Sequence, residues 1–189
     1  MIVGILALQG DFREHEKTLK KLGISTIQVK LPKDLEKVDR LIIPGGESTT
    51  IGKLLVLYKL LEPIRKRVKK GMPLWGTCAG AILMAKRIAD GKHDQPHLEL
   101  MDITARRNAF GRQLDSFEAS VFIKEVNEKP IPVVFIRAPL LELPSKSVRV
   151  LARLGDKKIV AAKQGKMLAT CFHPELTDST MLHRYFLSI

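Results

Sequence analysis

A cysteine between two glycines is the residue of this sequence best suited to covalent chemistry. Cys78 lies in the run WGTCAGA, flanked by Gly76 and Gly80. An apolar run precedes it, and the stretch Ala79 to Ala89 is typical of a helix, which together predict a tight strand-to-helix turn. In such a nucleophile elbow, glycines relieve backbone crowding, and the helix amino terminus favours a thiolate and offers N–H donors to an oxyanion. The alternative is a buried structural cysteine beside unrelated glycines.

A thiol nucleophile needs a base, and His173 in the segment ATCFHPEL is the best placed of the five histidines. Pro174 favours an extended conformation for the residue before it, in which His173 and Glu175 point to the same side. A carboxylate beside an imidazole fixes its tautomer and stabilises the imidazolium. Although HPE alone is also typical of a surface turn, we expect Cys78 and His173 to form a catalytic pair that the fold brings together.

The second cysteine and the other histidines are expected to be structural. Cys171 lies in an apolar strand without glycines, which is typical of a core thiol. His15 is expected on the face of a helix, and His183 in a terminal helix. Cys78, Cys171 and His173 could supply metal ligands, but no C-x-x-C or H-x-x-x-H spacing supports such a site. We therefore expect no metal and no cofactor.

Length and composition indicate a globular protein. The chain has 189 residues, of which 45% are apolar, enough for one α/β domain with a substantial core. No apolar run reaches the roughly 18 residues of a membrane span. The amino terminus lacks the basic start and the cleavage site of a signal peptide, and two cysteines do not make a disulfide framework. We therefore expect a cytoplasmic protein with no membrane partner.

The formal net charge of +12 raises the question of nucleic acid binding. The densest basic run is RKRVKK, Arg65 to Lys70. It has no interleaved aromatic residues on which bases could stack, and only 5% of the chain is aromatic. We interpret the run as a solvated helix face, with a docking face for an acidic protein as the second choice.

The first half of the chain alternates strands and helices. Residues 2–8 form a continuous apolar run, typical of a strand buried on both faces, and residues 25–30 and 39–46 predict two more strands. A helix is expected over residues 11–23, where Asp11 and Glu14 have the spacing of a capping box. A long helix is expected after residue 48, capped by Ser48 or Thr49, with Pro63 marking a break or a new helix.

The second half reads mostly as strands, followed by a terminal helix in DSTMLHRYFLSI. Repeated strand–helix units predict a parallel sheet with helices on both faces. The expected fold is therefore an α/β, three-layer arrangement with a mostly parallel central sheet and an antiparallel portion in the second half. We see no linker or repeat, and expect one domain over residues 1–189.

Several motifs together resemble a known family. The elbow GTCAG, PGGES upstream of it and FHPE near the carboxyl end are similar to the class I, triad-type glutamine amidotransferases. The longer blocks LALQGDFREH, LIIPGGESTTIGKLL, GTCAGAILMAK, RRNAFGRQLDSFEA, VFIRAP and FHPELTD resemble the glutaminase subunits of pyridoxal 5'-phosphate synthases. These blocks run from residue 6 to residue 178, which is nearly the whole chain.

The resemblance implies hydrolysis of L-glutamine to L-glutamate and ammonia through a glutamyl thioester. Cys78 would be the nucleophile, His173 the acid and base, and Glu175 the residue that orients His173. Backbone N–H groups of Gly46 and Ala79 would bind the oxyanion. The ammonia would serve a synthase subunit in the biosynthesis of pyridoxal 5'-phosphate, or vitamin B6, in a heteromeric complex. The resemblance also implies a lyase activity in addition to the hydrolase activity.

The resemblance further implies which residues bind glutamine. Free glutamine carries an ammonium and a carboxylate, so its site needs both acceptors and donors. Arg106 stands beside Arg107, which leaves that assignment ambiguous by one position. The residues carried over from the family's pattern are Gly46, Glu47, Ser48, Arg107, Ile136 and Arg137.

Two other functions remain open from the sequence. The same glutaminase chemistry could serve a different synthase, or the chain could be a cysteine hydrolase of related fold. A basic module that binds nucleic acid, with an inert cysteine, belongs to a different functional class. The blocks RRNAFGRQLDSFEA and FIRAP argue against the first pair of alternatives. The absence of aromatic residues from the basic run Arg65 to Lys70 argues against the last.

Overall fold

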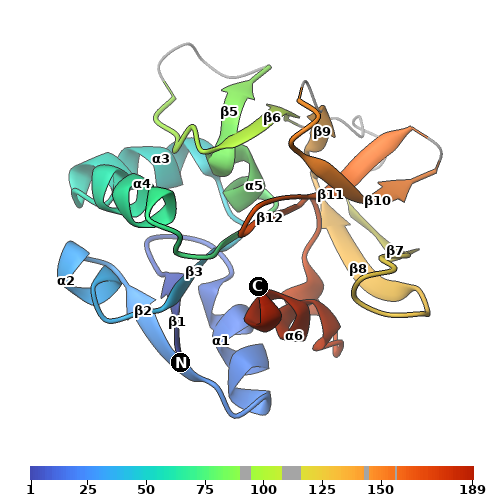
Figure 1. Cartoon of the computed structure of the whole chain (residues 1–189), viewed down its shortest axis with the longest axis horizontal. Coiled ribbons are helices and arrows are strands. Elements are labelled where there is room, and N and C mark those ends of the chain that lie inside the picture. The colour runs from blue at the N-terminus through green and yellow to red at the C-terminus, as the bar shows by residue number, and fades with distance from the viewer. Residues whose placement is uncertain (90–94, 108–115, 143–144, 156) are drawn as a thin grey trace.

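The computed structural model describes residues 1–89, 95–107, 116–142, 145–155 and 157–189 (Figure 1). Among these residues, ten strands form one sheet in the order β2-β1-β3-β4-β12-β11-β9-β6-β5, with β10 paired to β11. Their bounds are β1 Ile2–Leu6, β2 Ser25–Val29, β3 Arg40–Ile43, β4 Leu74–Thr77, β5 Ala85–Ile88, β6 Met101–Arg106, β9 Leu140–Glu142, β10 Arg149–Leu154, β11 Lys158–Gln164 and β12 Met167–Thr170.

The strands β2, β1, β3, β4 and β12 are parallel, whereas β9, β10 and β11 add antiparallel pairings. All four residues of β4 are buried, as expected of a parallel strand that is covered on both faces. A separate antiparallel pair consists of β7 Ser116–Val121 and β8 Ile131–Ile136. The α/β architecture predicted from the sequence, with an antiparallel portion in the second half, is confirmed.

Helices cover both faces of the parallel strands. In Figure 1, α1 and α6 lie on one side of β1 and β3, and α3, α4 and α5 lie on the other. This arrangement follows from right-handed crossovers that move in opposite directions from β1 and from β3. The helical elements are α1 Phe12–Lys21, α2 Pro32–Leu35, α3 Ser48–Leu57, α4 Leu61–Lys69, α5 Ala79–Met84, the short 3₁₀ turn η1 Pro174–Leu176 and α6 Met181–Ser188.

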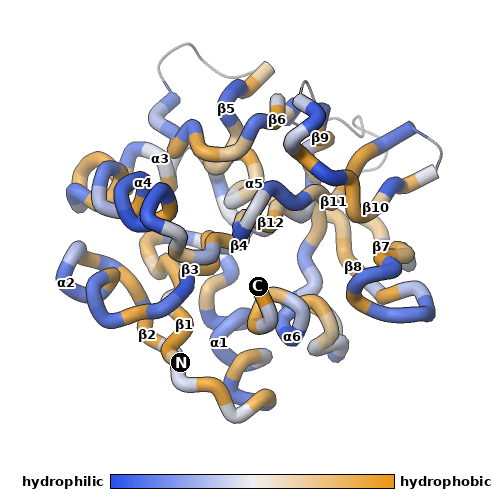
Figure 2. The backbone as a smooth tube through the Cα atoms, viewed as in Figure 1, coloured by the Kyte–Doolittle hydropathy of each residue, from blue (hydrophilic) through white to orange (hydrophobic). Residues whose placement is uncertain are grey.

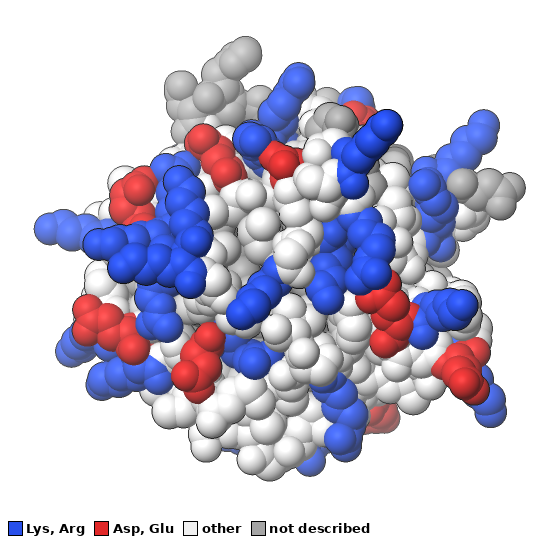
Figure 3. Space-filling model, in the orientation of Figure 1, with Lys and Arg blue, Asp and Glu red and all other residues white. Residues whose placement is uncertain are grey.

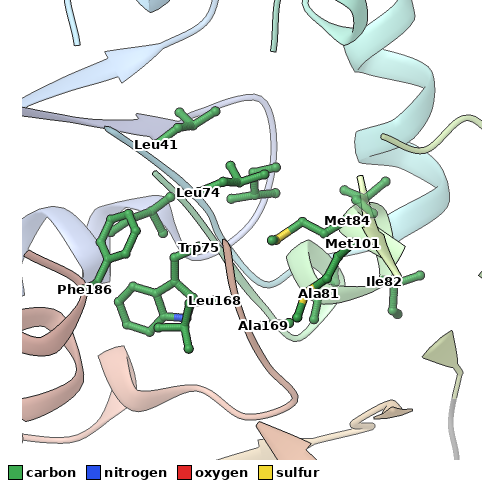
Figure 4. Close-up of a cluster of buried hydrophobic side chains, with 14 of the residues drawn as sticks. Leu41, Leu74, Trp75, Ala81, Ile82, Met84, Met101, Leu168, Ala169 and Phe186 are labelled. Atoms are coloured by element: carbon green, nitrogen blue, oxygen red, sulfur yellow. The ribbon is translucent and has the colours of Figure 1, made fainter. Parts of the chain in front are cut away.

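The core lies between these layers. Figure 2 shows hydrophobic residues along the central strands, and Figure 4 shows part of the buried cluster around β4. Trp75 and Phe186 are both fully buried, with ring centroids 5.5 Å apart, so α6 packs directly against the strand that leads to Cys78. No helix in the described ranges is long and apolar enough to cross a lipid bilayer.

Several local predictions are wrong. The helix expected over residues 79–89 ends at Met84, because Ala85 turns into extended backbone and begins β5, which pairs with β6. Glu47, and not Ser48 or Thr49, caps α3 by accepting from the backbone of Thr49 and Thr50. Asp11 begins α1 without the expected side-chain cap. Helix α2 and strand β9 were not expected from the pattern, since both are very short.

Candidate active site

Cys78 occupies a strained turn between β4 and α5. Its backbone has φ of 47° and ψ of −102°, a left-handed conformation that costs a residue with a side chain about 1–3 kcal/mol. A Cβ atom on Gly76 would collide with the backbone of Gly80, and one on Gly80 would collide with the carbonyl oxygen of Ile43. The Cys78 amide donates to the Thr170 carbonyl at 2.8 Å, which ties the turn to β12. Close packing therefore explains both glycines of the elbow.

The carboxyl ends of four neighbouring parallel strands lie side by side at one edge of the sheet. The segments that follow β1, β3, β4 and β12 supply most of the lining of a cavity of about 330 Å³, at the edge of the sheet where α/β proteins commonly bind ligands. The lining residues are Gln9, Asp11, Gly46, Glu47, Ser48, Cys78, Ala79, Ile82, Arg107, Ile136, Arg137 and His173. Every predicted site residue lines this cavity except Glu175, which lies behind His173.

His173 and Glu175 are held together, although not in the expected way. Pro174 starts the η1 turn, so the segment is not extended beyond His173. The Nδ1 atom of His173 nevertheless lies 2.9 Å from Oε1 of Glu175, and the carboxylate is fully buried. The amide of His173 donates to the carbonyl of Val134 at 2.7 Å, which fixes the imidazole relative to β8.

The charge state of His173 is set by its neighbours. Burial lowers the pKa of His173, but hydrogen bonds with Asp11, Cys78 and Glu175 outweigh burial and raise it well above its ordinary value. Burial also raises the pKa of Glu175, whereas His15 and His173 lower it more strongly, so the carboxylate stays ionised. The arrangement suits an imidazolium that is placed between a carboxylate and a thiolate.

Backbone donors stand close to the thiol. Gly46 and Ala79 line the same cavity as Cys78, and neither amide has a protein acceptor in the part of the chain that the structure describes. The side chain of Gln9 accepts from the amide of Glu47 at 2.8 Å, which holds the loop after β3 in place. These amides are available to a developing negative charge on a bound carbonyl oxygen.

The polar side of the cavity contains a carboxylate–guanidinium pair. Glu47 Oε1 lies 3.3 Å from Nη2 of Arg107. Nη1 of Arg107 contacts Thr49 and Gln95 at 3.4 and 3.3 Å. Partial burial raises the pKa of Glu47, but hydrogen bonds from Thr50 and Thr49 outweigh it and lower the pKa to about 2. Arg106 instead pairs with Glu142 at 3.0 Å, so the cavity receives Arg107 and not Arg106.

The opposite wall comes from the end of β8. Arg137 is exposed, has φ of 41° and lines the cavity directly after the strand ends at Ile136. The Cys78 thiol lies 3.8 Å from the carbonyl oxygen of Ile136. Ser48, in contrast, is buried, and its hydroxyl has no hydrogen-bond partner in the described ranges.

Sequence reasoning gave no functional role to several residues that the structure places at or behind the cavity. Gln9 and Asp11 follow β1, and Asp11 Oδ2 lies 3.3 Å from His173 Nδ1. His15, expected on a helix face, and His183, expected in the terminal helix, are both completely buried behind Glu175. The signal for Gln9 and Asp11 is their position just after a buried strand, beside the other strand ends.

Asp11, His173 and Glu175 also bring three potential metal ligands within 4.8 Å of one another. Their facing atoms are engaged with each other, since His173 Nδ1 lies within reach of both carboxylates. The expectation that the protein binds no metal stays a prediction.

The basic run of α4 has structural partners. Arg65 pairs with Glu62 and Glu99, and Arg67 donates to the backbone carbonyls of Leu35 and Val38. Figure 3 shows Lys and Arg side chains gathered on the surface over α4. This helix face holds its neighbours together as well as facing solvent.

Comparison with known proteins gives strong matches over the whole chain. Residues 5–189 match the model of the SNO glutamine amidotransferase family. The chain is 63% identical to pyridoxal 5'-phosphate synthase subunit PdxT of Roseiflexus sp. (strain RS-1), with 100% of both chains covered. It is 54% identical to the PdxT subunit of Chloroflexus aurantiacus, again with 100% of both chains covered.

Solved structures give the same result for the fold. A crystal structure of a glutamine amidotransferase superposes with a TM-score of 0.94 at 51% identity, covering 100% of this chain and 98% of the other. A second glutamine amidotransferase, from Thermotoga maritima, has a TM-score of 0.63 at 16% identity, covering 99% of this chain and 80% of the other. At that identity the second likeness concerns the fold alone.

Proposed function

We propose that this chain, which belongs to the SNO glutamine amidotransferase family, uses Cys78, His173 and Glu175 to hydrolyse L-glutamine to L-glutamate and ammonia. It acts as the glutaminase subunit of a pyridoxal 5'-phosphate synthase and supplies ammonia to a synthase subunit. The observation that carries the catalytic assignment is the cavity in which the thiol, the imidazole and the expected glutamine-binding residues meet.

The reaction begins when His173 takes the proton of the Cys78 thiol and Sγ attacks the side-chain amide carbon of glutamine. The carbonyl oxygen becomes an oxyanion, to which the amides of Gly46 and Ala79 donate. His173 then gives its proton to the amide nitrogen, the carbon–nitrogen bond breaks, and ammonia leaves a glutamyl thioester. In the second half, His173 takes a proton from water and the resulting hydroxide attacks the thioester. The carbon–sulfur bond then breaks, His173 returns its proton to the departing Cys78 thiolate, and glutamate is released.

Glu175 acts on His173 throughout. Its ionised carboxylate holds the Nδ1–H of the imidazole, which leaves Nε2 for the proton transfers and stabilises the imidazolium. Glutamine is oriented by Glu47, Ser48, Arg107, Arg137 and the backbone at Ile136. Glu47 is already occupied by capping α3 and by Arg107, so its role includes positioning that guanidinium as well as accepting from the substrate.

The expected lyase activity is wrong for this chain. The family model that covers residues 5–189 describes a glutamine amidotransferase, which fits a hydrolase. The relatives' name favours pyridoxal 5'-phosphate synthase over a different synthase. A cytoplasmic location stays a prediction, and we propose that residues 1–189 form one glutaminase domain because both termini contribute to the same sheet and site.

A comparison of the two cysteines tests the proposed function. Glutamate release should be lost in Cys78→Ala and largely retained in Cys171→Ala, both assayed with the synthase subunit present. The control is well matched, because Cys171 is fully buried and burial raises the pKa of its thiol. A similar loss of activity in the two variants, or none in Cys78→Ala, would remove Cys78 from the role of nucleophile.

A further inference from the structure

We propose that His15 is a positioning residue for the glutaminase reaction: it donates from Nε2 to Glu175, and His183 on α6 fixes its tautomer. The inference rests on the proposed function and extends the catalytic triad inward by two residues. The resulting chain of side chains runs from the last helix of the protein to the nucleophile.

The geometry shows a continuous buried network. Nε2 of His15 lies 3.4 Å from Oε1 of Glu175, the same oxygen that faces His173, and 3.2 Å from the hydroxyl of Thr77. Nδ1 of His15 lies 3.0 Å from Nε2 of His183. Both outer histidines are 0% exposed, so water does not satisfy their ring nitrogens. The catalytic carboxylate is therefore held between two imidazoles.

The hydrogen-bond partners available to His183 and His15 determine their tautomers. Burial is the largest cause that lowers the pKa of His183, to about 3, so His183 carries a single ring hydrogen at neutral pH. Its Nδ1 has no partner among the described residues. A buried N–H without an acceptor is rarer than an unfilled acceptor, which places the hydrogen on Nε2 of His183.

That assignment determines the direction of the next contact. If Nε2 of His183 donates, Nδ1 of His15 accepts, and the hydrogen of His15 must lie on Nε2. There it points to Thr77 and to Glu175, which is ionised and can accept. Each ring N–H in the network then has an acceptor, and Glu175 Oε1 receives hydrogens from His15 and His173.

The environment of the network is otherwise apolar. The ring of His15 lies edge-on to Trp75, with centroids 5.5 Å apart, and Trp75 also contacts His183 at 4.9 Å. The titratable groups that face Glu175 are His15 from α1 and His173 from the segment before η1. Those that face His15 are Glu175 and His183, while Asp11 and Cys78 reach only His173. Removal of one donor from Glu175 is therefore not compensated by another charge.

The first test is the tautomeric state of the wild-type chain. Nitrogen-15 spectra of the histidine rings at neutral pH should show both His15 and His183 as Nε2–H tautomers, with resonances assigned through His15→Gln and His183→Gln. An Nδ1–H tautomer of His15 would overturn the proposal. This readout does not depend on turnover, so it stands apart from a failure of the proposed glutaminase function.

The second test is kinetic, in the complex with the synthase subunit. His15→Met, which has no donor, should lower kcat for glutamine by roughly 10- to 100-fold, as loss of an outer hydrogen-bond partner does at other sites. The KM should be unchanged, and the acid limb of the kcat profile should move to higher pH because the pKa of Glu175 rises. His15→Gln, whose amide can donate from the same place, should restore most of kcat and the acid limb.

A control separates positioning from packing. Phe186→Leu weakens α6 against Trp75 without touching the network, so it should lower stability but leave the acid limb in place. If His15→Met behaves like Phe186→Leu, or if His15→Gln gives no recovery over His15→Met, His15 is only a packing residue. If His15→Met does not fold, the tautomer measurement and His15→Gln still decide the question.

Discussion

The proposed role of Glu175, orienting His173, depends on one carboxylate oxygen, Oε1. Its Oε1 accepts from His173 at 2.9 Å inside the protein, and the ionised form is maintained by its neighbours. Glu175→Gln should lower kcat by about 10⁴-fold, by analogy with the amide substitution in the serine protease triad, with less effect on KM. The amide fills the same space, but it can hold the wrong tautomer and cannot stabilise an imidazolium.

The measurement is steady-state glutamate release by the two proteins at equal folded concentration. Near wild-type kcat in Glu175→Gln would mean that another carboxylate takes over. Asp11 is then the candidate, because it lies 3.3 Å from the same ring nitrogen. Asp178, the next acidic residue after Glu175 in the sequence, is on the surface and pairs with Lys21. The double variant with Asp11→Asn would identify it.

At the residue scale, the candidate site residues that could be predicted from the sequence are those marked by their immediate neighbours in the chain. Cys78 is marked by its glycines, and His173 and Glu175 by their proximity in sequence. The role of Asp11 was missed, because its spacing from Glu14 also fits a capping box. His15 and His183 come from the first and last helices, and only the packing of those helices on Trp75 brings them together.

At the scale of elements, α6 brings a pH-sensitive group into the core. The pKa of His183 is about 3 in the folded chain, compared with about 6.5 in an unfolded chain. Above pH 6.5 the His183 ring is neutral in both the folded and the unfolded chain, so its titration does not change the free energy of unfolding. As pH falls below 6.5, His183 becomes protonated in the unfolded chain but stays neutral in the folded chain. The free energy of unfolding therefore falls by up to about 1.4 kcal/mol per pH unit.

His183→Gln removes this titration and keeps a donor at the same place. Its free energy of unfolding should fall less steeply than that of the wild type between pH 6.5 and 4.5, as measured by urea unfolding. The window stops there because Glu175, whose folded pKa is lowered, begins to lose its own contribution at lower pH. Parallel pH dependences of the two proteins would contradict the assignment to His183.

Element boundaries were the least predictable feature. The apolar stretch after Cys78 fits a helix throughout, but Ala85 is taken by pairing of β5 with β6, a contact that local pattern does not show. The cap of α3 was misplaced by one or two residues because Glu, Ser and Thr follow one another there, and the longer Glu47 side chain reaches the amides of Thr49 and Thr50.

At the scale of the whole molecule, net charge governs encounter with the partner. A surface with a formal charge of +12 favours association with an acidic face, and that attraction is screened by salt. We expect glutamate release to be slow for the chain alone and to rise when the synthase subunit binds. Completion of the donor pair around the oxyanion accounts for such activation, since one misaligned donor costs about 10²–10³ in rate.

The experiment titrates the synthase subunit into a fixed amount of this chain at low and high ionic strength. The half-saturating concentration should increase with salt, while the rate at saturation stays the same. A rate that remains flat at saturating synthase, with no complex in gel filtration at either salt concentration, would contradict the coupling of docking to catalysis.

The sequence predicted the layers of the fold but not the order of its strands. Strand–helix alternation is a local pattern, whereas β12 pairs with β4 across about 90 residues, parallel on one side and antiparallel to β11 on the other. Such pairings depend on which edges remain free after the rest of the chain has packed, and no local pattern shows this.

The place of β12 between β4 and β11 has a consequence for synthesis on the ribosome. His173 is translated 95 residues after Cys78, a delay of about 5–20 s at ordinary elongation rates. Until β12 arrives, the edge of β4 that it will cover is unpaired, and it can pair with a strand of another polypeptide. During the same interval Cys78 has no His173 to act as its base. The nascent polypeptide is therefore most prone to aggregation while it still lacks catalytic activity.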